Sequence, residues 1–280
     1  MSFGRRTAIS EIGAVSKIYV RQRAFDYGEF DLIEAVDGFV DQMKQWLYRP
    51  EELPREAIYA NAVHEFLCRG GSQYVRDTRW KPDRIAAVRA GLQAMGALDY
   101  LEYFEWLVAQ VEALKSDIDR LFRHGGKWDA AIRGALNHRS RDLQGLQKAR
   151  PIIPLIAGYL AKLPNLQPLD DQSFDMKMYE LVESVPDYRA RLEASMHDGH
   201  WVAQMVYLLC LKSGQRYHRH AGPPTLIDLA DRTGAIGVML TRGEHKIIQY
   251  PDRAELRDMS GNLVAAASLN ETRLESRPLN

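Results

Sequence analysis

The sequence has little that would place it in a specialised class of protein. Among its 280 residues it has only two cysteines, Cys68 and Cys210, and both stand in apolar runs. That position indicates buried free thiols and a reducing cytoplasm rather than a disulfide framework. Charge of one sign is not in excess either, because 37 Lys and Arg balance 37 Asp and Glu. A neutral chain has no global field that would draw it onto nucleic acid or an anionic membrane.

Long apolar runs and targeting signals are also missing. No run reaches the roughly 18 apolar residues that a membrane span needs. The first residues include Arg5 and Arg6 but no apolar core after them, which argues against a secretory signal. We therefore expect a cytoplasmic protein without a membrane partner.

The familiar catalytic motifs are absent from the sequence. There is no Gly-x-Ser-x-Gly, no phosphate loop and no dinucleotide glycine fingerprint. His64-Glu65 lacks the second histidine of a zinc protease, because position 68 is cysteine. Cys68 precedes two glycines, which would expose it as a nucleophile in a turn, but the preceding Phe66 and Leu67 favour a buried structural thiol.

The sequence does contain strong helical periodicity. One apolar stripe with steps of three or four comprises Phe30, Ile33, Val36, Val40, Met43 and Leu47. Further helices are predicted after Pro54, after Pro82, over 98–121 and over 128–148. We expect a helical domain over 28–163, preceded by an N-terminal extension over 1–27. Residues 164–172, with two prolines and no period, are the best linker candidate.

The C-terminal part, residues 173–280, is predicted to be a helical segment followed by strands. A short capped helix is expected over 225–232. Beyond Gly234 the apolar period changes to two, first at Ile236, Val238 and Leu240 and then at Lys246, Ile248 and Tyr250. With Arg242-Gly243-Glu244 and Ser260-Gly261-Asn262 as turns, this period predicts a small antiparallel β-meander. The predicted fold class is mainly α (α+β).

Residues 68–74, Cys-Arg-Gly-Gly-Ser-Gln-Tyr, and residues 95–97, Met-Gly-Ala, carry a family resemblance. Over about residues 56–108 the chain resembles a bacterial helical domain, largely of unknown function, whose founding member is a DNA-mimic protein. Gly70, Gly71, Gln73 and Tyr74 match the family's glycine turn, although Arg69 replaces its asparagine and one aromatic is missing. We expect these four residues to form a structural turn, with Gln73 bonded to loop backbone and Tyr74 in the core.

The resemblance implies a protein partner, but the charge pattern does not fit whole-surface mimicry of DNA. Between residues 29 and 150 acidic and basic blocks alternate and nearly cancel, whereas a polyanion mimic needs sustained negative charge. Local mimicry would use one acidic helix face, formed by Asp31, Glu34, Asp37 and Asp41; the alternative is that this face is only solvated surface.

Four of the eight histidines fall within 24 residues: His197, His200, His218 and His220. Histidine is a common ligand for zinc, so a metal site is a candidate here. The alternative is that these are exposed or helix-capping histidines, since no cysteine or glutamate stands at a familiar spacing.

Two functions follow from the sequence. The first is a non-enzymatic bacterial interaction or regulatory protein that binds another protein through surface helices, without a cofactor and without direct contact to nucleic acid. The second is a metal-binding module or metal-dependent hydrolase centred on the histidine cluster.

Overall fold

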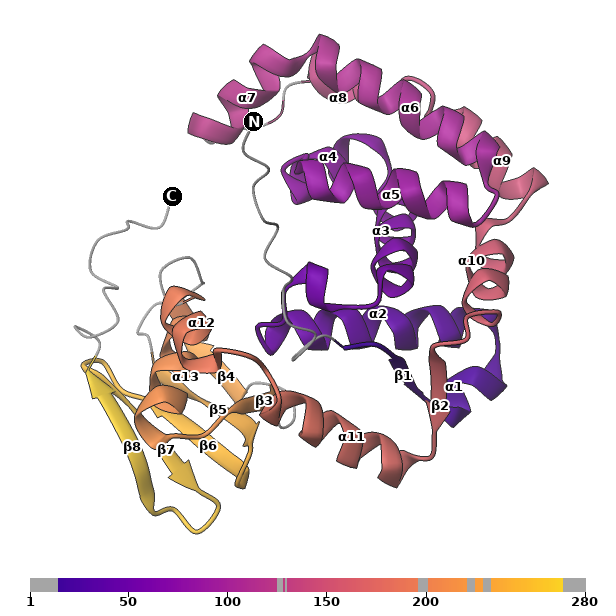
Figure 1. Cartoon of the computed structure of the whole chain (residues 1–280). Helices are drawn as coiled ribbons and strands as arrows, with labels where there is room; N and C mark the ends of the chain where they lie inside the picture. The colour runs from indigo at the N-terminus through magenta and orange to yellow at the C-terminus, as the bar shows by residue number, and fades with distance from the viewer. Residues whose placement is uncertain are drawn as a thin grey trace, which may run out of the picture. The chain divides into compact units, whose positions relative to one another are not determined.

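The computed structural model describes residues 15–124, 128, 130–195, 201–220, 225–228 and 233–268. The chain divides into two compact units. Described residues 15–43 and 49–174 form one, here called the helical unit, and residues 44–48 and 175–268 contribute to the other, the C-terminal unit (Figure 1). The predicted fold class, mainly α with a C-terminal antiparallel sheet, is confirmed.

Short helices make up most of the helical unit. In chain order its elements are β1 (Ile18–Arg21), α1 (Gln22–Tyr27), α2 (Glu29–Gln45, whose last two residues belong to the other unit), η1 (Pro50–Glu52), α3 (Arg55–Arg69), α4 (Gly71–Thr78), α5 (Pro82–Ala94), α6 (Leu98–Ala113), α7 (Lys115–His124), α8 (Ala130–Leu136), α9 (Ser140–Ala149), α10 (Ile152–Leu160) and β2 (Leu166–Leu169).

Helix α3 is the centre of this unit and packs against α4, α5 and α10 (Figure 1). Its Phe66 ring is fully buried and meets Tyr74 of α4 at 5.3 Å and Phe104 of α6 at 5.0 Å, both edge to face. Such aromatic pairs add to the free energy gained by burying their area. The apolar stripes expected from the sequence therefore meet here, around α3.

Two short strands join the beginning and end of the helical unit. β1 pairs in parallel with β2, with Ile18 opposite Leu166 and Arg21 opposite Leu169. Residues 18–27 are thus elements of this unit rather than an extension. The expected linker likewise contains a strand, although Pro168 in it can donate no ladder hydrogen bond, which suits only an edge position.

Three helical expectations need correction. The helix expected over 98–121 is interrupted at Leu114, so α6 and α7 are separate, and residues 128–148 contain two helices, α8 and α9. Phe30, placed in the buried stripe by its spacing, is 51% exposed. It stands in the first turn of α2, before the helix reaches the core.

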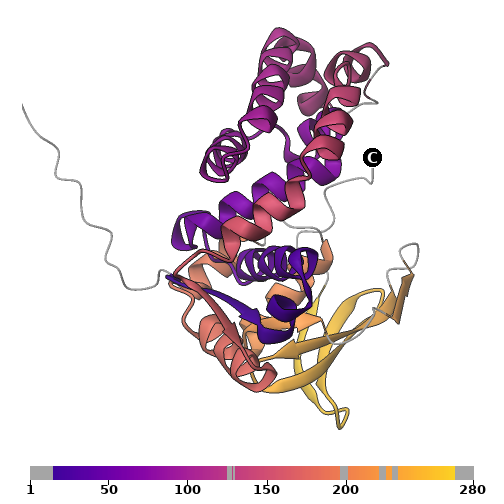
Figure 2. The same ribbon diagram turned by 90° about the vertical axis from the view of Figure 1, so that its right-hand side faces the viewer.

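The C-terminal unit combines helices with an antiparallel sheet (Figure 2). Its elements are α11 (Asp171–Glu183, which starts in the helical unit), α12 (Tyr188–Ser195), α13 (Trp201–Ser213), β3 (Tyr217–His220), β4 (Thr225–Asp228), β5 (Thr233–Leu240), β6 (Gly243–Gln249), β7 (Arg253–Asp258) and β8 (Leu263–Ser268).

The sheet has the strand order β3-β5-β6-β7-β8, with β4 also pairing with β5. Helix α13 packs against β3, β7 and β8. The meander is as predicted, but residues 225–228, expected in a helix, form β4. In β6 the buried residues are His245, Ile247 and Gln249, so the core-facing set is one residue out of step with the alternation of Lys246, Ile248 and Tyr250.

Candidate functional site

A chain of polar side chains crosses the seam between α2 and α3. The Asp37 carboxylate lies 2.5 Å from Nδ1 of His64, and Nε2 of His64 lies 3.3 Å from Sγ of Cys68. The other Asp37 oxygen accepts a hydrogen bond of 3.1 Å from the Asn61 amide. The seam therefore brings together a carboxylate, an imidazole and a thiol in series, which we call the Asp37–His64–Cys68 chain.

Helical spacing explains how this arrangement forms. Asn61, His64 and Cys68 are three and four residues apart on α3, so their side chains share one face. Asp37 reaches them from α2, where it is half-buried. His64 is 9% exposed, whereas Cys68, at the outer end of the Asp37–His64–Cys68 chain, is exposed. The expectation that Phe66 and Leu67 place Cys68 in the core is wrong, because the face of α3 that carries Phe66 is not the face that carries Cys68.

The surroundings of His64 favour its protonated form. Its hydrogen bond to Asp37 raises the pKa of the imidazole above 6.5, and the charges of Asp37 and Glu34 act in the same direction, while burial opposes them. The pKa of the Cys68 thiol is also raised, first by burial and then by Asp37 and Glu34, with Arg69 opposing. The thiol is thus not a free thiolate stabilised by a cation, and any reactivity has to come through His64.

The chemistry of the chain follows from its donors and acceptors. An ionised carboxylate can only accept, so Asp37 fixes the proton on Nδ1 and leaves the Nε2 lone pair of the neutral imidazole toward Sγ. A nucleophile, a base and an orienting carboxylate in this order are the arrangement that activates serine and cysteine nucleophiles. The geometry permits proton transfer from the thiol to His64.

The acidic face expected on α2 divides in two. Asp37 is turned into the seam, whereas Asp31, Glu34 and Asp41 are exposed. Asp31 and Glu34 make no ion pair with any described residue. By contrast, Glu105 and Asp99 on α6 are neutralised by Arg89 at 2.5 Å and Arg150 at 3.4 Å.

Three aromatic residues lie close to Asp31 and Glu34 in the sequence. Phe25, Tyr27 and Phe30 are 39%, 74% and 51% exposed, although apolar rings are usually covered. Helix α1 has no buried residue at all. Phe30 also lies against the Asp37–His64–Cys68 chain, with the centre of its ring 6.2 Å from the centre of the His64 ring. We call Phe25, Tyr27, Phe30, Glu29, Asp31 and Glu34 together the α1–α2 surface.

The glycine turn has a structural position. Gly70 ends α3 with a φ of 68° and a ψ of −179°, and Gly71 begins α4 directly. A Cβ on Gly71 would lie 2.5 Å from the Leu136 carbonyl oxygen, so the turn lets α8 approach. Tyr74 is buried as expected, but Gln73 is exposed and bonds to no described residue. The expectation that Gln73 bonds to loop backbone is wrong, because the turn between α3 and α4 is one residue long and Gln73 already lies in α4.

The expected histidine cluster is only partly within the described residues. His197 and His200 lie outside them, and the side chain of His220 does too. The ring of His218 is buried between Trp46, at 4.9 Å, and Tyr179, at 4.2 Å. Burial lowers its pKa to about 4. Among the described residues no group of three potential ligands converges on one point.

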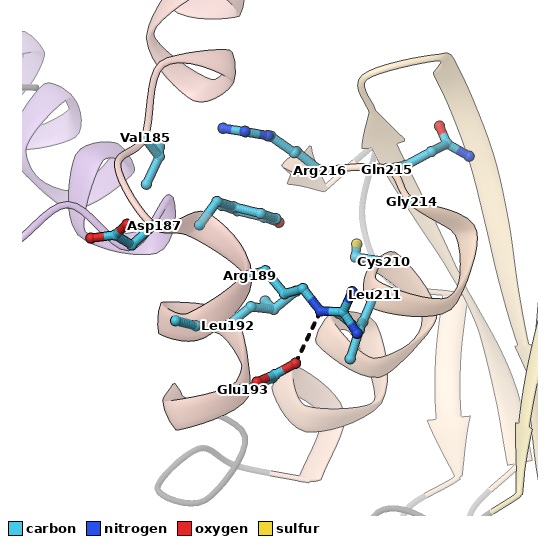
Figure 3. Close-up of a pocket in the computed structure, with 12 residues that line it drawn as sticks. Val185, Asp187, Arg189, Leu192, Glu193, Cys210, Leu211, Gly214, Gln215 and Arg216 are labelled. Atoms are coloured by element: carbon cyan, nitrogen blue, oxygen red, sulfur yellow. Dashed lines mark hydrogen bonds and ion pairs between the residues drawn. The ribbon is translucent and has the colours of Figure 1, made fainter.

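A cavity of about 650 Å³ opens in the C-terminal unit between α12, α13 and the residues entering β3 (Figure 3). Three of its charged side chains have partners within the unit: Arg189 pairs with Glu193 at 3.1 Å, and Arg216 donates to the Val182 carbonyl at 2.7 Å and stacks on Tyr188. Cys210 in its wall is buried, which raises its thiol pKa to about 12.

Comparisons with family models, curated proteins and solved structures gave no match for this chain. The resemblance to the DNA-mimic family thus stays a prediction from residues 56–108. Within the described residues, no helix has the length and apolar character needed to cross a membrane.

Sequence reasoning missed the Asp37–His64–Cys68 chain because its members have no linear motif. The spacing of His64 and Cys68 was visible as half of a zinc-protease pattern, and Asp37 was grouped with the exposed acids. One signal was available in the sequence. Asp37 on the first helix and His64 on the next each lie at the margin of an apolar stripe, and polar residues at such margins can meet when the two stripes pack together.

Proposed function

We propose that this chain is a non-enzymatic interaction protein that binds a basic segment of another protein through the α1–α2 surface. The observation that carries the proposal is the exposure of Phe25, Tyr27 and Phe30 among carboxylates that make no ion pair with the described residues. Aromatic side chains are the commonest anchors of protein interfaces, and charge around them selects the partner and speeds its approach.

Charge decides the kind of partner. Residues 22–41 contain six acidic residues and one basic residue, so the surface attracts lysine- or arginine-rich protein and repels nucleic acid. The acids of α6 support no such role, since two of them are already neutralised within the unit. The metal-binding alternative is not tested by the described residues: His218 is enclosed by aromatic rings, and the side chains of His197, His200 and His220 lie outside the described residues.

The proposal is tested by placing a photo-crosslinking amino acid at Tyr27 in the living cell of origin. We expect a defined covalent adduct whose partner peptide is rich in lysine or arginine. The double variant Asp31→Lys, Glu34→Lys should lose at least about tenfold of this adduct, because reversed charges opposite a basic segment cost several kcal/mol. Asp37 is left intact, since reversing it would also disturb His64.

The matched control reverses two exposed carboxylates elsewhere in the same unit, Glu102→Lys on α6 and Asp119→Lys on α7. This variant should keep the adduct. A partner that crosslinks equally to both double variants, or no adduct above that of an unirradiated sample, would reject the α1–α2 surface as the binding site.

A further inference from the structure

The exposed end of the Asp37–His64–Cys68 chain is a thiol beside an oriented imidazole, an arrangement that binding another protein does not require. Among the described residues, the buried structural Cys210 has no imidazole beside it. Cys68 is accessible, and its sulfur lies 3.3 Å from a nitrogen whose ring is oriented by a carboxylate. We propose that Cys68 is a nucleophilic thiol that exchanges with positively charged disulfides, with His64 as its proton acceptor and Asp37 as a positioning residue.

The reaction is balanced by the groups present and the disulfide itself. Cys68 Sγ attacks one sulfur of the disulfide as its proton passes to Nε2 of His64. A new S–S bond forms to Cys68, the old S–S bond breaks, and the leaving sulfur takes the proton from His64. Cys68 is oxidised to a mixed disulfide while the disulfide is reduced to one thiol and one mixed-disulfide sulfur.

Disulfide exchange suits this site better than acyl transfer. Acyl transfer depends on donors that hold a developing oxyanion. Cys68 stands in the last turn of α3, where the free backbone groups of a helix are carbonyls and its dipole is negative. In disulfide exchange the negative charge moves onto the leaving sulfur, which His64 can protonate.

The charges around Cys68 determine which disulfides it reacts with fastest. Glu34 and Asp37 of α2 face the thiol, and the cation that the described residues place beside it, Arg69 of α3, is engaged by Glu65 at 3.2 Å and Asp77 at 2.7 Å. The local field is therefore negative. A cationic disulfide is attracted to it and an anionic one is repelled, and the difference should shrink as salt screens the exposed charges.

The test measures mixed-disulfide formation at Cys68 by peptide mass spectrometry, with cystamine as the cationic probe and dithiodipropionate as the anionic probe. We expect cystamine to react faster by about tenfold or more at low salt. The rate with cystamine should rise in two steps with pH, which are the two macroscopic titrations of the coupled His64–Cys68 pair. The lower step frees His64 to accept the thiol proton, and the upper step ionises the thiol itself. Cys210 should stay unmodified throughout and reports that the protein remains folded.

Variants separate proton transfer from structure. His64→Gln should remove the lower step and slow the reaction at pH 7.5 by about tenfold or more, as expected for loss of a general base. Asp37→Asn should move the lower step to lower pH, because the imidazole loses the carboxylate that raises its pKa. His138→Gln, the same change at an exposed histidine, should alter neither step.

The wild-type pH profile decides the proposal even if a variant does not fold. A single step above the usual thiol pKa, with no preference between the two disulfides, would overturn it. So would a wild-type rate equal to that of folded His64→Gln at pH 7.5. Because the probes are small molecules, failure of this test leaves the crosslinking test of the α1–α2 surface unaffected.

Discussion

Gly71 lies so close to α8 that any side chain would have to displace backbone. Its absent Cβ would be 2.5 Å from the Leu136 carbonyl oxygen and 2.8 Å from Oδ1 of Asn137. The Asn137 oxygen also accepts a hydrogen bond of 3.0 Å from the Ser72 backbone N–H. At the scale of the residue, the glycine pair is thus explained by packing between α4 and α8.

This contact predicts the effect of Gly71→Ala. The added methyl group should lower the free energy of unfolding by about 1–3 kcal/mol, because overpacking forces the neighbouring backbone to move. Urea unfolding followed by far-UV circular dichroism measures the loss. The control is Gly38→Ala, in the middle of α2 with nothing within 4 Å, which should raise stability by about 0.5–1 kcal/mol. Equal effects of the two substitutions would contradict the packing explanation.

Single residues also mark where sequence reasoning stops. Tyr74 could be placed in the core from its type and position, and Cys210 from its apolar neighbours, and both are buried. Cys68 had similar neighbours and is exposed, since burial depends on the side of α3 that faces α4 and α6. Asp37 resembled the exposed acids along α2, and only the position of α3 shows that it binds His64.

At the scale of the element, α1 differs from every core helix in burying none of its residues. Its exposed rings cannot contribute much to folding. We therefore expect Tyr27→Ala to change the free energy of unfolding by less than about 0.5 kcal/mol, the usual range for surface substitutions. The same substitution should weaken crosslinking at a photo-reactive residue placed at Phe25, because it removes an anchor of the interface.

The matched comparison is Phe66→Ala, which removes a fully buried ring from the centre of the helical unit. It should cost about 3–5 kcal/mol. Thermal unfolding of the three proteins, wild type and both variants, distinguishes these cases. A loss for Tyr27→Ala that approaches the loss for Phe66→Ala would mean that α1 is covered within the chain and is not free to bind a partner.

Elements were predicted where local periodicity decides them. The helices around α3 and the strands β5 and β6 follow from spacing of three to four, or two, in the sequence. The spacing does not show which face of β6 is buried, and it does not show β7, which buries three consecutive residues. The break at Leu114 was missed because the residues around it include no glycine or proline. β2 and β4 were missed because each is four residues long and owes its conformation to a partner, β1 across the helical unit for the first and β5 for the second.

At the scale of the whole molecule, the two units contain histidines shifted in opposite directions. His64 of the helical unit has its pKa raised by Asp37, so its contribution to stability is complete below pH 6.5 and is lost as the pH rises through the raised value. His218 of the C-terminal unit has its pKa lowered to about 4 by burial, so stability is lost as the pH falls from 6.5 toward 4.

The units should therefore respond oppositely to pH. Pulse proteolysis in urea, with the peptides of each unit quantified by mass spectrometry, reports both stabilities in one sample. Between pH 6.5 and 4 we expect His218 to cost the C-terminal unit about 3 kcal/mol, the free energy of the shift in its pKa, and His218→Phe to reduce this loss. Between pH 6.5 and 8.5 the helical unit should lose stability, and Asp37→Asn should flatten that decline. If both units instead weaken together at each pH, with neither variant changing the slope of its own unit, their stability is governed by something other than these two imidazoles.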